Sequence, residues 1–264
     1  MKKRFIIMLA ALLVLSISLS GCSAINSAKE SVEASKTAGI DVDGGWTIDD
    51  DGGFSFAFVI TNTTEDKIAA RILYHVDALD EEGNRIPYTE PFFNTGDPLL
   101  LKQLMPGKSY VECASFDAAG NANMFEKTPA SFECTVEDIS WNNAIAGPVL
   151  DITDVQEEVT DDIFVGLDDE PLDYNGMPVD MISYTVTLKN NGEKDFTWSD
   201  EGEGYGLLVY VVYRDGDGNI IGGTMAFDEN GGSGNTIAAG EELVLKMSAP
   251  VPEGVKTELY PVVN

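Results

Sequence analysis

The sequence predicts an all-β chain in which two antiparallel β-sandwiches follow each other after an N-terminal signal segment and a flexible tether. Three observations support this prediction. One unit of alternating strands occurs twice, residues typical of tight turns separate the strands, and no long stretch beyond residue 40 has the 3.6-residue period of a helix.

Residues 1–21 have the pattern of a signal peptide, with a basic start at Lys2–Arg4 and a short apolar run from Phe5 to Leu15. This run is too short to span a bilayer comfortably. The following Leu19–Cys22, Leu-Ser-Gly-Cys, resembles the lipobox of bacterial lipoproteins, in which the cysteine is acylated and becomes the first mature residue. The resemblance implies that lipid on Cys22 anchors the chain to the extracytoplasmic face of the cell membrane. The alternative is an uncleaved signal anchor with an incidental cysteine.

Residues 22–40 form the expected lipidated N-terminus and tether. They are rich in Ser, Ala, Lys and Glu and contain no aromatic residue, so they cannot bury a core of their own. We therefore expect them to hold the folded part of the chain away from the lipid surface.

The rest of the chain contains the same unit at residues 41–143 and 144–264. In each copy one strand ends at an asparagine, a second leads into Asp-x-x-Gly-Asn-x-Ile, and a later glycine starts another strand. The matched residues are Asn62, Asp80, Gly83, Asn84, Ile86 and Gly107 in the first copy, and Asn190, Asp215, Gly218, Asn219, Ile221 and Gly240 in the second. Asp-x-x-Gly suits a type I turn with a G1 bulge, so we expect a structural role for these turn residues.

Apolar residues alternate along the strand before each turn, which indicates half-buried antiparallel strands. They are Ile72, Tyr74, Val76 and Ala78 in the first copy, and Leu207, Val209, Val211 and Tyr213 in the second. Several such strands in a unit of roughly 100 residues are typical of an immunoglobulin-like sandwich.

The asparagine-ended strand, the next strand, the hairpin and the glycine turn together resemble the FxLYD-type and related immunoglobulin-like domains of Gram-positive bacterial lipoproteins. At the position of the motif that names this family, the chain has VDALD (76–80) and VVYRD (211–215). Only Tyr213 and Asp215 match that motif. The resemblance implies an extracytoplasmic, non-enzymatic protein and supplies no catalytic residues.

The chain carries 45 acidic and 16 basic residues, a formal net charge of −29. This charge repels nucleic-acid phosphates, so a nucleic-acid partner is not expected. An acidic surface that keeps an exported protein soluble is the simplest explanation. Binding of cations or of a basic partner is the alternative.

Cys113 and Cys134 lie in expected strands and are compatible with one disulfide or with two buried thiols. His75, the one histidine, falls on the strand face opposite Tyr74 and Val76, where we expect it to meet solvent or a sheet edge. With one histidine and no clustered cysteines, we expect no zinc site and no enzyme activity.

Asp215–Asn219 begins like an EF-hand loop but continues with Ile220 and Ala226 where that loop needs Gly and Glu, which favours a turn. The acidic loop with Asp168, Asp169 and Glu170 offers oxygen ligands for weak calcium binding, and no other cofactor is expected. Trp198 and Tyr205 flank an acidic insertion, where they either contact a sugar or peptide or belong to the core.

The expected function is that of a membrane-anchored, non-catalytic interaction module whose partner is a protein, an envelope polymer or a host glycan. The first alternative is a calcium-dependent glycan- or envelope-polymer-binding lipoprotein. The second is a structural spacer.

Overall fold

A computed structural model describes residues 39–48, 52–88, 98–116, 124–143, 149–160, 173–174, 177–197, 207–228 and 236–263. The expected signal peptide and most of the tether lie outside these residues. All named elements in the described residues are β-strands, and all their pairings are antiparallel, so the prediction of an all-β antiparallel fold is confirmed. None of these residues forms a helix of the length and apolarity that crossing a membrane requires.

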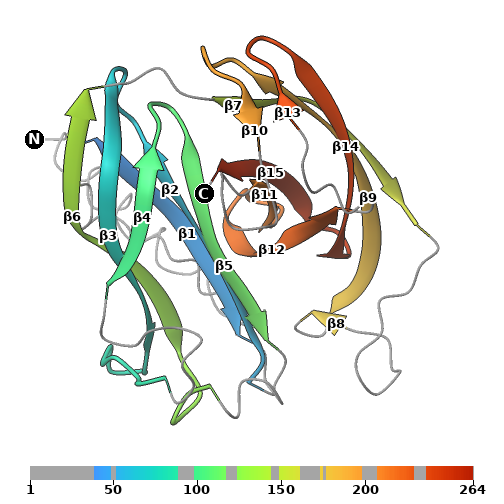
Figure 1. The fold of residues 1–264 in the computed structure, drawn as a ribbon. Coiled ribbons are helices and arrows are strands. Elements are labelled where there is room, and N and C mark those ends of the chain that lie inside the picture. The colour runs from blue at the N-terminus through green and yellow to red at the C-terminus, as the bar shows by residue number, and fades with distance from the viewer. Residues whose placement is uncertain are drawn as a thin grey trace, which may run out of the picture.

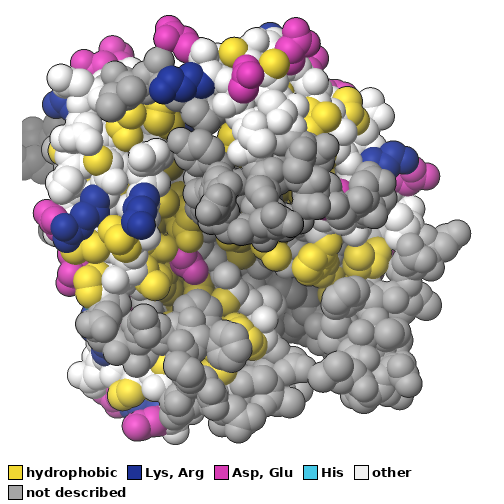
Figure 2. All heavy atoms as spheres, in the orientation of Figure 1, with side chains coloured by type: hydrophobic (Ala, Val, Ile, Leu, Met, Phe, Trp, Pro, Cys, Tyr) yellow, Lys and Arg dark blue, Asp and Glu magenta, His cyan; other side chains and the backbone are white. Residues whose placement is uncertain are grey.

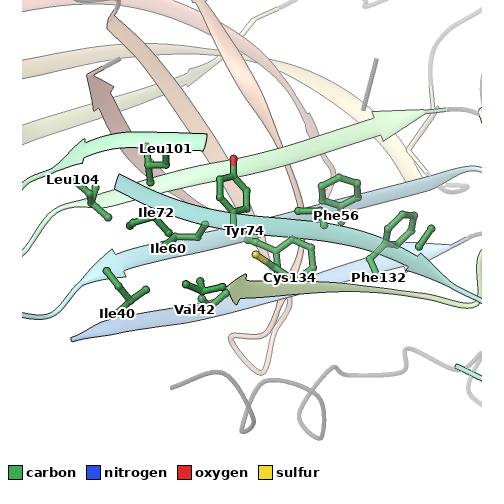
Figure 3. Close-up of a cluster of buried hydrophobic side chains, with 14 of the residues drawn as sticks. Ile40, Val42, Phe56, Ile60, Ile72, Tyr74, Leu101, Leu104, Phe132 and Cys134 are labelled. Atoms are coloured by element: carbon green, nitrogen blue, oxygen red, sulfur yellow. The ribbon is translucent and has the colours of Figure 1, made fainter. Parts of the chain in front are cut away.

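The N-terminal half, residues 40–143, is a pair of facing three-stranded sheets (Figure 1). Their orders are β1-β2-β5 and β4-β3-β6, with bounds β1 Ile40–Ile48, β2 Phe54–Asn62, β3 Lys67–Leu79, β4 Leu99–Leu104, β5 Ser109–Phe116 and β6 Ser131–Asn143. Apolar side chains from both sheets fill the space between them, including Phe56, Ile72 and Phe132 (Figure 3). Their removal from water is the main stabilising term of this half.

The C-terminal half, residues 150–263, is built around one sheet in the order β15-β11-β12-β14-β9-β7, which folds over its own core. The end of β12 joins its two parts, because Phe227 pairs with Ser248 and Asp228 with Met247. Short strands β8, which pairs with β9, and β10 and β13, which pair with each other, complete the half. The bounds are β7 Leu150–Val159, β8 Asp173–Tyr174, β9 Met177–Asn190, β10 Phe196–Thr197, β11 Leu207–Arg214, β12 Ile220–Asp228, β13 Thr236–Ile237, β14 Glu242–Pro252 and β15 Lys256–Val263.

The two halves share a common pattern of pairing. In each, the first strand pairs with the asparagine-ended strand, which pairs with the strand after the later glycine turn: β1-β2-β5 and β7-β9-β14. In each, the strand before the Asp-x-x-Gly turn pairs with the closing strand, β3 with β6 and β11 with β15. The internal similarity of the sequence therefore corresponds to an internal similarity of strand order.

Asn62, at the end of β2, is fully buried and connects three segments of the N-terminal half. Its side-chain amide donates to the carbonyl oxygens of Lys67 at 2.8 Å and of Leu104 at 2.9 Å. Its side-chain oxygen accepts from the Thr64 backbone N–H at 3.0 Å and from the Thr64 hydroxyl at 2.7 Å. A buried amide with donor and acceptor atoms both satisfied fixes the course of the chain around it.

Asn190, at the end of β9, has the same role in the C-terminal half and is also fully buried. Its amide donates to the carbonyl oxygens of Lys194 at 2.7 Å and of Ile237 at 3.0 Å. Its oxygen accepts from the backbone N–H groups of Gly192 at 3.0 Å and of Val149 at 3.2 Å. The shared asparagine of the repeat thus joins a strand end to the segment before the glycine turn in both halves.

A third apolar cluster lies between the two halves, where β1, β2 and β5 face β12 and β15 (Figure 1). Ala57, Val59 and Val111 of the N-terminal half contact Val212 and Ile220 of the C-terminal half, and all five are buried. β2 is consequently buried on both faces, one toward its own core and one toward the other half. We call this cluster the junction.

The backbones approach closely at the junction. A Cβ atom built on Gly45 of β1 would lie 1.8 Å from the carbonyl oxygen of Ile220, so only glycine fits there. Beside it, the Thr47 hydroxyl donates to the carbonyl oxygen of Ile221 at 3.1 Å. Arg214 pairs with Asp43 across the junction at 3.1 Å. These contacts fix the two halves against each other.

We predict that Asn190→Ala lowers the free energy of unfolding by about 2–4 kcal/mol, because it leaves the buried Ile237 carbonyl and the Val149 N–H without their partner. The matched control is Asn191→Ala, which removes an exposed hydrogen bond to Asp151 and should cost less than about 1 kcal/mol. Denaturant unfolding of the Cys22→Ser chain measures both. Equal losses would contradict the role assigned to Asn190.

We predict that Gly45→Ala destabilises the protein by at least about 2 kcal/mol, since its methyl group overlaps the Ile220 carbonyl oxygen at the junction. Gly216→Ala is the control, because a Cβ atom there meets nothing within 4 Å. Thermal unfolding compares the two variants. If Gly45→Ala melts with the parent chain, the close approach at the junction is refuted.

Candidate functional site

Most binding residues predicted from the sequence lie outside the described part of the chain. This holds for the lipidation site, the acidic loop and the aromatic pair: Cys22, Asp168, Asp169, Glu170, Trp198 and Tyr205. Calcium binding, aromatic ligand contacts and acylation therefore stay predictions.

The carboxylate of Asp215 closes its turn through hydrogen bonds to the chain. One oxygen accepts from the backbone N–H groups of Asp217 and Asn219, both at 2.9 Å, and the other accepts from the Asn219 side chain at 3.0 Å. Gly218 has φ +88°, which glycine adopts without strain. These contacts account for the aspartate as a turn residue without any metal.

Asp80 makes the equivalent turn in the N-terminal half, accepting from the backbone N–H groups of Glu82 at 3.1 Å and Asn84 at 2.8 Å, while Gly83 has φ +80°. Lys127 also pairs with it at 2.6 Å. The Lys127 ammonium and the Asn84 backbone hydrogen bond hold the pKa of Asp80 well below its usual range.

Cys113 and Cys134 are free thiols, the second of the two alternatives that the sequence left open. The two side chains belong to different apolar clusters. Cys134 of β6 lies in the core of the N-terminal half (Figure 3), whereas Cys113 of β5 points out of that half and packs at the junction. A sheet therefore separates the sulfur atoms. Burial raises the pKa of both thiols, which keeps them protonated and unreactive.

His75 is also placed differently from expectation. It lies on the predicted face of β3, but its side chain is buried instead of exposed to solvent. Its Nε2 atom lies 2.8 Å from a carboxylate oxygen of Glu137 on β6. A partner on the neighbouring strand explains how a polar ring is accommodated there.

A carboxylate lies among tyrosines inside the N-terminal half. Glu112 of β5 accepts hydrogen bonds from the hydroxyl groups of Tyr74 at 2.6 Å and Tyr110 at 3.0 Å. Burial raises the pKa of Glu112, and the two hydrogen bonds oppose that rise only in part. The site holds a carboxyl group that ionises less readily than a surface glutamate.

The view in Figure 2 shows where side chains of each type gather on one face. Hydrophobic side chains collect over β4 and β5, and acidic ones are spread around both halves. Leu100 of β4, at the free edge of its sheet, is 49% exposed. The hydrophobic side chains over β4 and β5 therefore form an apolar patch on the surface of an otherwise highly charged molecule.

A pocket of about 440 Å³ opens at the end of the C-terminal half where β9 begins and the β14–β15 hairpin turns. We call it the hairpin pocket. Its charged lining residues are Glu157, Asp180, Glu253 and Lys256. Its apolar lining residues are Ile182, Val251, Pro252 and Val255. The pocket thus joins an apolar wall to three carboxylates and one ammonium group.

Two of these carboxylates lie on the same side of the sheet as buried residues, but Asp180 is half-buried and Glu157 is exposed. Asp180 alternates with the buried Ile182 and Tyr184 along β9, so all three share one face. Glu157 of β7 is the register partner of Tyr184. At this end of the sheet both carboxylates are therefore accessible to solvent.

Tyr184 follows Asp180 and Ile182 on one face of β9, and its side chain is fully buried. The Thr257 hydroxyl lies beside the Tyr184 hydroxyl and itself donates to Glu157 at 2.7 Å. Burial raises the pKa of Tyr184, and the interaction with Thr257 opposes that rise.

Comparisons with known proteins yield neither a matching family model nor a matching curated protein.

Sequence inspection missed the hairpin pocket, although one signal for it was present. In VDMISYTVTLKN (179–190), the inward-facing series starts with Asp180 before it turns apolar. Glu112 gives the same signal between Tyr110 and Ala114, which share its face of β5. Neither signal shows which residues of other strands lie next to Asp180 or Glu112 in the folded protein.

We predict that Glu112→Gln raises stability at pH 8 but not at pH 4. The folded state raises the pKa of Glu112, so it holds this proton to a higher pH than the unfolded chain. The stability of the parent chain relative to the variant must then fall as the pH rises from the unfolded pKa, near 4.5, through the folded one. Glutamine keeps an oxygen that accepts from the tyrosines.

Denaturant unfolding across this pH range measures the difference. Glu241→Gln, an exposed change of the same charge, controls for the general repulsion among acidic residues. If Glu112→Gln follows the same pH dependence as Glu241→Gln, the burial of Glu112 does not affect its ionisation.

Proposed function

We propose that the chain is a membrane-anchored, extracytoplasmic lipoprotein of a Gram-positive bacterium that acts as a non-catalytic binding module. In this proposal residues 41–143 and 144–264 are two immunoglobulin-like β-sandwich domains, and lipid on Cys22 holds them at the membrane. The partner is a protein, an envelope polymer or a host glycan. The Leu-Ser-Gly-Cys sequence and the repeat support the anchoring and the domain organisation.

The hairpin pocket is the observation that carries the binding function. It is open, and it joins three carboxylates and one ammonium group to an apolar wall. An apolar wall with a few convergent polar groups is the usual form of a small-molecule binding site, so this pocket supports a binding function.

A structural spacer is the second candidate, and the junction favours it. A spacer needs two halves that keep their relative orientation, and the buried apolar cluster with the Gly45–Ile220 approach provides that rigidity. Calcium-dependent glycan binding has no comparable support, because the residues that suggested it lie outside the described part.

The test is sedimentation of the purified Cys22→Ser chain with washed Gram-positive envelope fragments. We predict saturable binding that weakens at least tenfold when Glu157→Gln and Asp180→Asn are combined, since both remove charge from the hairpin pocket. Glu158→Gln is the matched control, because its carboxylate lies next to Glu157 in β7, is exposed and does not line the pocket.

Absence of saturable binding would overturn the binding function and favour the spacer. Binding that the pocket variant leaves unchanged would place the contact elsewhere on the chain. For the anchor, the parent chain should sediment with membranes and resist a high-salt wash, and Cys22→Ser should release it.

A further inference from the structure

We propose that the free edge of β4 docks on the anionic surface of the membrane to which the chain is anchored. The inference rests on the proposed lipid anchor and adds an orientation of the N-terminal half on the bilayer. Four residues carry it, and we call them the edge patch: Arg71 and Leu73 of β3, and Leu100 and Lys102 of β4.

The register of β3 and β4 brings these four side chains together. Arg71 lies opposite Lys102, and Leu73 lies opposite Leu100. They share the outer face of the sheet, because they alternate along their strands with residues of the core. Leu100 is 49% exposed, and both cations are exposed as well. Figure 2 shows Lys and Arg side chains among the hydrophobic ones over β4.

The two cations are poorly compensated within the chain. Like charges directly opposite each other on a sheet destabilise it. Asp138 of β6 offsets this only in part, since its carboxylate lies 3.8 Å from the Arg71 guanidinium. Lys102 forms no ion pair with any described residue. In a chain with a net charge of −29, an anionic partner gives this pairing of cations a physical reason.

A bilayer surface fits both the charge and the apolar part of the edge patch. Anionic headgroups attract the two cations, and the leucines pack at the boundary between headgroups and acyl chains. The acidic residues of the rest of the molecule oppose this contact little where they lie beyond the Debye length, about 8 Å at physiological ionic strength. A small patch at one edge therefore approaches a membrane that repels the molecule as a whole.

The tether keeps the edge patch within reach of the membrane. β1 begins at Ile40, whose register partner is Asn62, and Asn62 donates to the carbonyl oxygen of Leu104 at the end of β4. The chain thus enters the fold at the end of the half where β4 finishes. Residues 22–40 span at most about 60 Å when extended. An anchor this close raises the effective concentration of the patch at the surface, so a weak attraction is enough to favour contact.

The same edge is poorly suited to pair with another strand. A lysine on an edge strand is a common protection against strand addition, and Lys102 has that position. Gln103 has φ +58° and is not paired with β3, so the regular part of β4 ends at Lys102. A second copy of the chain on the edge patch would bring four cations together, where like charges repel.

The experiment measures how fast the side-chain amine of Lys102 is acetylated at a vesicle surface. The Cys22→Ser chain carries a histidine tag in place of residues 1–21 and is held by a nickel-chelating lipid, so the tether works whether or not the native chain is acylated. One set of vesicles is phosphatidylcholine, and the other has equal parts of phosphatidylcholine and phosphatidylglycerol. A neutral acetylating ester and mass spectrometry give the rate at each lysine.

Val244 and Lys246 of β14 are the matched control. They repeat the spacing of Leu100 and Lys102 and are also exposed. Lys246 lies opposite Thr185, however, and not opposite a second cation. We expect acetylation of Lys102 to slow at least threefold relative to Lys246 on the anionic vesicles only. Salt at about 1 M, where the Debye length is about 3 Å, should remove this protection.

Variants test the edge patch itself. Arg71→Gln and Leu100→Gln should each remove most of the protection of Lys102, whereas Val244→Gln should leave it unchanged. All three side chains are exposed, so the melting temperatures should stay close to that of the parent chain.

Three results would overturn the proposal. The first is equal acetylation of Lys102 on both kinds of vesicle. The second is protection that Arg71→Gln leaves intact. The third is protection that appears without vesicles and rises with protein concentration, which would show a second copy of the chain on the edge patch.

The docking and the anchor fail separately. If the parent chain stays with membranes while Lys102 is not protected, the orientation is wrong and the anchor stands. If Lys102 is protected in the tagged chain while the parent chain does not sediment with membranes, the edge patch binds anionic lipid and the native anchor is wrong.

Discussion

A buried asparagine at the end of one strand holds each half of this protein together. Asn62 and Asn190 each donate two hydrogen bonds to carbonyl oxygens and accept two from the chain, with no contact to water. Each connects the strand end to the segment before the next glycine turn, so the position of that turn depends on it. A side chain without both donors and acceptors leaves buried backbone groups unpaired, which explains why the same residue type stands in both copies.

The junction turns two similar halves into one body. In the N-terminal half, β2 has one face toward its own core and the other toward β12, so a strand that the repeat alone would leave half-exposed is buried on both sides. The approach is so close that a methyl group on Gly45 would overlap the carbonyl oxygen of Ile220. The junction also explains why Cys113 is half-buried without belonging to the core of its own half.

Polar groups at inward-facing positions distinguish the two halves from ideal sandwiches. Glu112 is satisfied inside the protein by two tyrosine hydroxyls. Asp180 and Glu157 line an open pocket instead, where Glu157 accepts from the Thr257 hydroxyl. The first arrangement is a closed structural feature, while the second is open to a ligand. This contrast is the physical basis for assigning binding to the C-terminal half.

The sequence by itself determined the all-β antiparallel class, the turns at Asp80 and Asp215 and the internal repeat. Alternation of apolar residues and turn chemistry are local properties, so one chain is enough to reveal them. The sequence did not determine that Cys113 and Cys134 face different cores, that His75 is buried, or that Asp180 and Glu157 meet at one pocket. Those facts depend on which outer face of one sheet packs on the other half and on the register between strands distant in the chain. Only the tertiary structure decides such contacts, because they join residues that no local pattern relates.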